Sequence, residues 1–136
     1  MSSQLVADAQ LYVSKALPNG AASTTSDAID LVNSTSGDFT ANCEILISGP
    51  ALATGVMGDG KTIKYDVITS TSSTLSGPTT IAATVLTQTG AGGAGCSAST
   101  ARFRLPSNVS RYIGVKATGS TSGDCSGSSF TVKVLF

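Results

Sequence analysis

Residues 55–62 carry a pattern that binds phosphate in many proteins. Their sequence, GVMGDGKT, satisfies G-x-x-x-x-G-K-T, in which backbone amides and a lysine surround nucleotide phosphates. That chemistry requires a helix directly after the motif, so that amides and helix dipole converge on the phosphate. The residues after Thr62 are instead rich in β-branched side chains, which are typical of a strand. We therefore expect residues 55–62 to form the loop of a long hairpin with Asp59-Gly60 at its turn.

Few other residues could support catalysis or bind a metal. The chain has no histidine to act as a general base, and Glu44 is its only glutamate. Serine and threonine are abundant, but a nucleophile needs a positioned base, and none stands out. The cysteines lack the spacing of a metal site, and no group of carboxylates resembles a calcium loop. The sequence thus predicts a protein that is not an enzyme and that holds no metal or cofactor.

The three cysteines suggest two different environments. Cys96 and Cys125 both lie in Gly/Ser-rich segments, where they form either a disulfide in an oxidising environment or two free thiols. A bridge would contribute roughly 3–4 kcal/mol in the chain-entropy model. Cys43 alternates in step with Ile45 and Ile47, so we expect it to be a small core residue.

Length and charge narrow the classes of partner. The chain has 136 residues, which fits a single domain over residues 1–136, and its net charge is zero. A nucleic-acid binder needs several clustered cations, so we expect no nucleic-acid partner. No apolar run reaches transmembrane length and no basic secretory region opens the sequence, so we expect cytosolic synthesis and no membrane. Since we expect no enzyme, we also expect no small-molecule substrate.

Apolar and polar residues alternate with a period of two along most of the chain, which predicts strands. The clearest lie near residues 43–48, 63–69, 112–117 and 130–136, with shorter candidates at 28–32, 79–88 and 102–105. Residues 90–95 and 119–127 are expected to be flexible loops, and residues 1–20 an extended N-terminal arm or an edge strand, with a short helix as the alternative. Seven to eight strands at this spacing indicate an all-β antiparallel sandwich, a jelly roll or a small barrel.

One predicted strand carries two arginines on its polar face. Arg102 and Arg104 alternate with Phe103 and Leu105, which are expected to face the core. The arginines, together with Arg111, either form a contact patch for acidic groups of a partner or are simply the solvent face of the strand.

Four segments, read in order, resemble the phage capsid cement (decoration) proteins, a family with a jelly-roll fold. They are Asp8-Ala9-Gln10 followed by a polar run and Ala28-Ile29-Asp30-Leu31; residues 63–69 leading into 76–82; Arg102-Phe103-Arg104-Leu105-Pro106 followed by residues 111–115; and the closing strand 130–136. The resemblance covers nearly the whole chain. The 90–95 loop and the Cys96/Cys125 pair depart from the family pattern.

This resemblance implies a structural protein of a bacteriophage virion, made in the cytoplasm of the bacterial host. Such a protein binds the outer surface of the capsid as a homodimer or homotrimer, bridges neighbouring major capsid proteins and stabilises the head against genome pressure. The residues expected at capsid or oligomer contacts are Gln4, Leu5, Asp8, Gln10, Tyr12, Arg102, Arg104 and Arg111. The alternative is a jelly-roll carbohydrate-binding or receptor-binding module of a phage tail or fibre. A nucleotide-binding enzyme that uses residues 55–62 is a third hypothesis.

Overall fold

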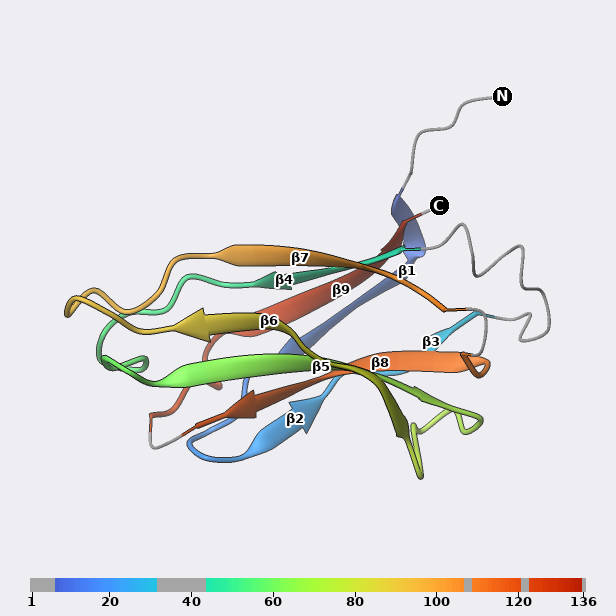
Figure 1. The fold of residues 1–136 in the computed structure, drawn as a ribbon, viewed down its shortest axis with the longest axis horizontal. Coiled ribbons are helices and arrows are strands. Elements are labelled where there is room, and N and C mark those ends of the chain that lie inside the picture. The colour runs from blue at the N-terminus through green and yellow to red at the C-terminus, as the bar shows by residue number, and fades with distance from the viewer. Residues whose placement is uncertain (1–6, 32–43, 107–108, 121–122, 136) are drawn as a thin grey trace.

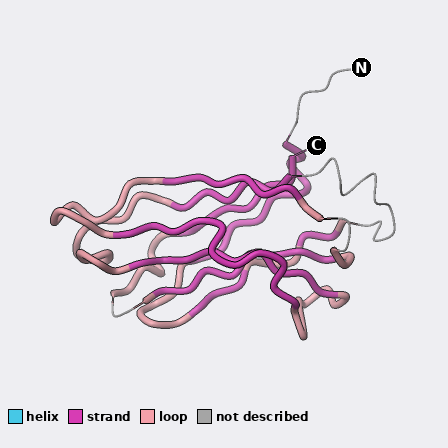
Figure 2. Tube along the Cα trace, viewed as in Figure 1, coloured by secondary structure: helices cyan, strands magenta, loops and turns pink. Residues whose placement is uncertain are grey.

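The computed structural model describes residues 7–31, 44–106, 109–120 and 123–135, with only the backbone for residues 7–11. These residues contain strands and loops but no helix (Figure 2). The strands are β1 (Ala7–Ala16), β2 (Ser23–Thr25), β3 (Ile29–Asp30), β4 (Glu44–Gly49), β5 (Thr62–Ser70), β6 (Thr79–Thr89), β7 (Ser99–Arg104), β8 (Tyr112–Gly119) and β9 (Ser129–Leu135). No described segment is a helix long and apolar enough to cross a membrane.

The strands form two antiparallel sheets stacked face to face (Figure 1). One sheet has the order β1-β9-β4-β7, and the other has the order β2-β8-β5-β6, with β3 also paired to β8. The pairing is nested: β5 pairs with β6, β4 with β7, β2 with β8, and β1 with β9. A double sheet of eight strand positions with this nesting is a jelly roll, which confirms the expected all-β antiparallel sandwich.

The strand count is nine, rather than the seven to eight expected, because one strand position is interrupted. Both β2 and β3 pair with β8, and Ser26–Ala28 separate them. At the interruption the Ser26 N–H donates to the Val115 carbonyl at 2.9 Å, while the Val115 N–H donates to Ser26 Oγ at 3.0 Å. A side chain thus replaces a backbone carbonyl in the ladder, so the chain leaves the sheet without leaving a buried amide unpaired.

The core lies between the two sheets and follows the predicted alternation. Ile63, Tyr65 and Val67 of β5 are buried, whereas Lys64 between them is exposed. Opposite them, Phe130 of β9 is fully buried, and its ring meets that of Tyr65 edge-on, with 5.5 Å between centroids and 68° between planes. Such edge-to-face pairs stabilise a core beyond their buried area. Cys43 lies outside the described residues, so its expected core position stays a prediction.

The N-terminal segment forms an edge strand from Ala7 to Ala16, which was one of the expected alternatives, and not a helix. Among the described strands, β1 pairs only with β9, with a register irregularity between Ala7 and Tyr12 and regular pairing from Tyr12 to Ala16. Residues 1–6, and with them Gln4 and Leu5, lie outside the described residues.

One of the two loop predictions was wrong, and the other was correct in part. Asp59 and Gly60 do form a turn, closed by the Lys61 N–H on the Gly58 carbonyl at 3.1 Å, but the loop is not a hairpin because β4 and β5 belong to different sheets. The 90–95 segment is a loop, as expected, and its backbone is hydrogen-bonded to the rest of the protein; its flexibility stays a prediction. Gly90 exchanges hydrogen bonds with the segment before β5: its N–H donates to the Lys61 carbonyl, and its carbonyl accepts from the Gly60 N–H. A glycine at position 90 lets the two backbone segments approach closely, because it has no side chain.

Candidate functional site: the outer face of the four-stranded sheet

The register of the four-stranded sheet places four residues side by side, two of which were predicted as contact residues. Tyr12 of β1 lies opposite Lys133 of β9, Lys133 lies opposite Leu46 of β4, and Leu46 lies opposite Arg102 of β7. We call these four residues the tyrosine–arginine row. The row crosses the whole sheet on the side away from the core, since its members alternate along their strands with residues that are buried or packed against the core.

The row joins an aromatic ring and cations on one exposed surface. The Lys133 ammonium lies 5.6 Å from the centroid of the Tyr12 ring, within the range of a cation–π contact. Tyr12 is the most exposed large hydrophobic residue of the described chain, at 43%. Leu46, between the two cations, is half-buried, and Arg102 is exposed. Two strand spacings separate Lys133 from Arg102, which corresponds to about 10 Å.

The charge of this face differs from that of the chain. Beside the row, Arg104 lies opposite Glu44 in the register. Among the described side chains of this face, three are cationic (Lys133, Arg102 and Arg104) and one is a carboxylate (Glu44), although the whole chain has no net charge. A locally positive face on a neutral protein attracts acidic groups of a partner and orients the encounter.

A second row, one pleat further along, consists of hydroxyl groups. Ser14, Thr131, Ser48 and Thr100 lie opposite one another across the four strands. Hydroxyls both donate and accept hydrogen bonds and carry no charge to desolvate. The outer face therefore combines a tyrosine and arginines, which are enriched in protein contact surfaces, with hydroxyls that can form hydrogen bonds with a partner.

The outer face ends at the edge of β1 that pairs with no other described strand. The Leu17 N–H donates to the Ser128 carbonyl at 2.9 Å, and by the antiparallel alternation the backbone groups of Tyr12, Ser14 and Ala16 point away from β9. The hydroxyl of Thr24 covers one of them, donating to the Ala16 carbonyl at 2.8 Å. The outward groups of Tyr12 and Ser14 have no hydrogen-bond partner among the described residues, so this edge can accept a further strand.

The structure brings some of the predicted contact residues together and separates others. Asp8 and Gln10 lie on β1, but their side chains are outside the description. Arg111 belongs to the other sheet. Its guanidinium donates to both carboxylate oxygens of Asp30, at 2.8 and 2.9 Å, and its carbon Cζ lies 5.3 Å from the ring centroid of Tyr112. The ion pair raises the pKa of Arg111 further above its ordinary value. Arg111 therefore ties β3 to β8, and does not extend the surface formed by Arg102 and Arg104.

Two members of the tyrosine–arginine row were absent from the prediction. The alternation in residues 130–136 placed Lys133 on a polar strand face, and the alternation in residues 43–48 placed Leu46 opposite to the core residues. No local signal indicated that β9 would lie between β1 and β4, which is what brings these side chains beside Tyr12 and Arg102.

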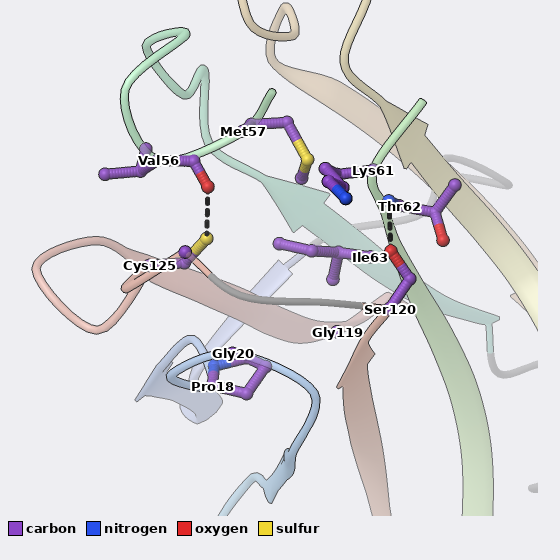
Figure 3. Close-up of a pocket in the computed structure, with 11 residues that line it drawn as sticks. Pro18, Gly20, Val56, Met57, Lys61, Thr62, Ile63, Gly119, Ser120 and Cys125 are labelled. Atoms are coloured by element: carbon purple, nitrogen blue, oxygen red, sulfur yellow. Dashed lines mark hydrogen bonds between the residues drawn. The ribbon is translucent and has the colours of Figure 1, made fainter. Parts of the chain in front are cut away.

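The phosphate-loop pattern lies at one end of the sandwich, where three loops meet (Figure 3). β5 follows it directly, so no helix begins there. The amides that would face a phosphate are already bonded within the protein: Gly60 N–H to the Gly90 carbonyl at 2.9 Å, Lys61 N–H to the Gly58 carbonyl at 3.1 Å, and Thr62 N–H to Ser120 Oγ at 2.8 Å. The hollow beside them has a volume of about 10 Å³, room for one water molecule. The backbone amides of this loop therefore bond within the protein and are not available to bind a nucleotide.

Cys96 and Cys125 are both free thiols in this structure. Cys125 is buried, and its thiol donates to the Val56 carbonyl at 3.5 Å (Figure 3). Burial raises the pKa of each thiol above its ordinary value. Both groups therefore favour the neutral thiol, which is less reactive than the thiolate. Among the described residues, no three His, Cys, Asp or Glu side chains come together as metal ligands.

Comparison with known proteins gives distant structural likenesses only. No family model and no curated protein matches the sequence. Among solved structures, a chain of the Cowpea mosaic virus empty virus-like particle is 8% identical with a TM-score of 0.45, covering 98% of this chain and 80% of that one. The CBM22-1–GH10 modules of Clostridium thermocellum xylanase 10B, complexed with xylohexaose, are 13% identical with a TM-score of 0.40, covering 99% and 28%. The jelly-roll assignment rests on the strand order of the two sheets.

Proposed function

We propose that this chain is a structural protein of a bacteriophage virion, which binds the outer surface of the capsid and cements neighbouring major capsid proteins. The observation that carries the proposal is the outer face of the four-stranded sheet. There the tyrosine–arginine row puts Tyr12, Lys133 and Arg102 on one exposed surface, beside the edge of β1 that pairs with no other described strand. The resemblance of the sequence to capsid cement proteins supports the same function.

The chemistry of this face suits a contact with a folded, acidic protein surface. Its cations attract carboxylates, Tyr12 supplies apolar area with little loss of side-chain entropy, and the hydroxyl row accepts whichever donors or acceptors the partner presents. A protein that binds only the assembled lattice stabilises that lattice by mass action. Symmetric self-association, as a dimer or trimer, would multiply the effect, because several weak contacts would act together.

The test is to add purified protein to genome-filled heads that lack it, and to measure co-sedimentation and the temperature at which the heads rupture. We expect saturable binding and a higher rupture temperature. Arg102→Glu should weaken binding by about tenfold or more, because it reverses a charge at the contact. Lys64→Glu makes the same charge change on an exposed residue of the other sheet and should bind normally.

Both variants should unfold at the same temperature as the parent protein, since each replaces an exposed side chain. Absence of saturable binding by the well-folded parent protein would disprove the cement function. Normal binding of Arg102→Glu would show that the contact lies elsewhere on the molecule.

A further inference from the structure

A polar groove of about 450 Å³ lies where the β2–β3 strand is interrupted, away from the face described above. It is lined by Thr25, Ser26, Asp27 and Ala28 on one side and by Ser73 and Thr74 on the other. The volume falls within the range of small-molecule sites. The two sides are far apart in sequence, so the groove exists only in the folded chain.

The first side of the groove is held rigidly by Ser26. This residue is 4% exposed, and its Oγ accepts from the Val115 N–H at 3.0 Å and donates to the Asp27 carbonyl at 3.1 Å. These bonds fix the backbone of Asp27 while the strand ladder is broken around it. The side chain of Asp27 is thereby presented on an ordered but unpaired segment.

The second side is the loop between β5 and β6, which is also fixed. Ser70 Oγ donates to the Ser76 carbonyl at 2.6 Å and accepts from the Ser72 N–H at 3.1 Å. Leu75 is 6% exposed and has a positive φ of 55°, a conformation that is strained for a branched residue. Its side chain packs on Gly114, where a Cβ would leave no room for it. Both sides of the groove are thus anchored on consecutive residues of β8.

We infer that this groove binds a neutral saccharide through the carboxylate of Asp27. Positive φ at a non-glycine residue and an interrupted ladder persist where the surrounding structure enforces them, and such strain gathers at binding sites. The Asp27 carboxylate is exposed and has no hydrogen-bond or ion-pair partner among the described residues. The inference is independent of the capsid function, because it concerns the other sheet and a different ligand.

The groups that line the groove select the chemical class of the ligand. An ionised carboxylate accepts hydrogen bonds with both oxygens, so it can hold two adjacent hydroxyls of a sugar ring. The hydroxyls of Thr25 and Ser73 can donate or accept, whereas those of Ser26 and Thr74 already bond within the protein. None of the described residues that line the groove is a lysine or arginine that could bind an anion, and one carboxylate is too few for a calcium site. None of them is aromatic, so recognition rests on hydrogen bonds.

The test is a titration of the isotope-labelled protein with maltohexaose, xylohexaose and chitotetraose, followed by amide chemical shifts. We expect saturable shifts at Thr25, Asp27, Ser73 and Thr74 with at least one of these sugars. Asp27→Asn should weaken that binding by about tenfold or more, because it removes charge-assisted hydrogen bonds. Asp59→Asn is the matched control; it keeps an oxygen to accept from the Gly93 N–H and should bind as the parent does.

Three results would overturn the inference. They are the absence of groove shifts with all three sugars, unchanged sugar binding by folded Asp27→Asn, and groove shifts produced by calcium chloride alone. Because the titration uses the isolated protein, its failure leaves the capsid experiment unaffected, and failure of the capsid experiment leaves the titration unaffected.

Discussion

A buried hydrogen-bond network around Gln88 gives the sharpest prediction about stability. The Tyr65 hydroxyl donates to Gln88 Oε1 at 2.7 Å, and Gln88 Nε2 donates to the carbonyls of Pro50 and Ser97 at 2.8 and 3.0 Å. Tyr65 is fully buried and Gln88 is 2% exposed. The network joins β5 and β6 to the loops that follow β4 and precede β7. We therefore expect it to contribute to stability, and Tyr65→Phe isolates one of its bonds.

The size of the effect follows from what the substitution leaves behind. Phenylalanine keeps the ring that packs edge-on against Phe130, so the change removes only the hydroxyl. Gln88 Oε1 then remains buried without its donor, which costs about 1–3 kcal/mol. For a domain of 136 residues, that loss lowers the melting temperature by roughly 3–15 °C.

The assay is urea unfolding of the parent and variant proteins, with scanning calorimetry to check that unfolding is two-state. Tyr112→Phe is the matched control, because Tyr112 is half-buried and its hydroxyl has no partner among the described residues. Its free energy of unfolding should change by less than about 0.5 kcal/mol.

A double-mutant cycle separates the bond from other effects of the substitution. In a Gln88→Met background the acceptor is already gone, so Tyr65→Phe should cost less there than in the parent by roughly 0.5–3 kcal/mol. Equal costs in the two backgrounds, or a loss in Tyr65→Phe no larger than that of Tyr112→Phe, would refute the reasoning.

Two further predictions concern a glycine and the thiols. Gly95 has a φ of 71°, and a Cβ there would fall on the Leu52 carbonyl, whereas Gly92, with a φ of 65°, has open space around it. Gly92→Ala should therefore lower the free energy of unfolding, measured in urea, by about 1 kcal/mol, and Gly95→Ala should lower it clearly more. Because burial raises the pKa of the Cys96 and Cys125 thiols, the stability that they contribute is present at neutral pH and is lost as pH rises beyond the ordinary thiol value of 9.0. Between about pH 8 and 10, the urea midpoint of Cys125→Ala should fall less steeply than that of the parent, and parallel slopes would contradict this account.

Local patterns in the sequence predicted which segments are strands and which face of each strand is buried. Ile63, Tyr65 and Val67 are buried as expected, and Arg102 and Arg104 are exposed beside the core-facing Phe103. Alternation of side chains is a property of a single strand, so it can be read without knowing the neighbours.

Contacts between residues that are far apart in the sequence could not be predicted in that way. Arg111 was grouped with the nearest arginines in sequence, yet it pairs with Asp30, 81 residues away. The composition of the glycine-rich 90–95 segment likewise did not indicate that Gly95 would lie against the carbonyl of Leu52, which is far away in the sequence. The short strand β2 was missed because its sequence, STT, lacks an apolar residue; it is held by pairing with β8.

The nested strand order also governs how this chain can fold. β9 lies between β1 and β4, so two of the three pairings in the four-stranded sheet involve residues 129–135. Among the described strands, only β5 and β6 are neighbours in sequence as well as in the sheet, and we expect that hairpin to form first because closing a short loop costs least entropy. During synthesis, β1 must therefore remain without its partner until β9 has been synthesised, and we expect slow folding, as is usual where most contacts are non-local.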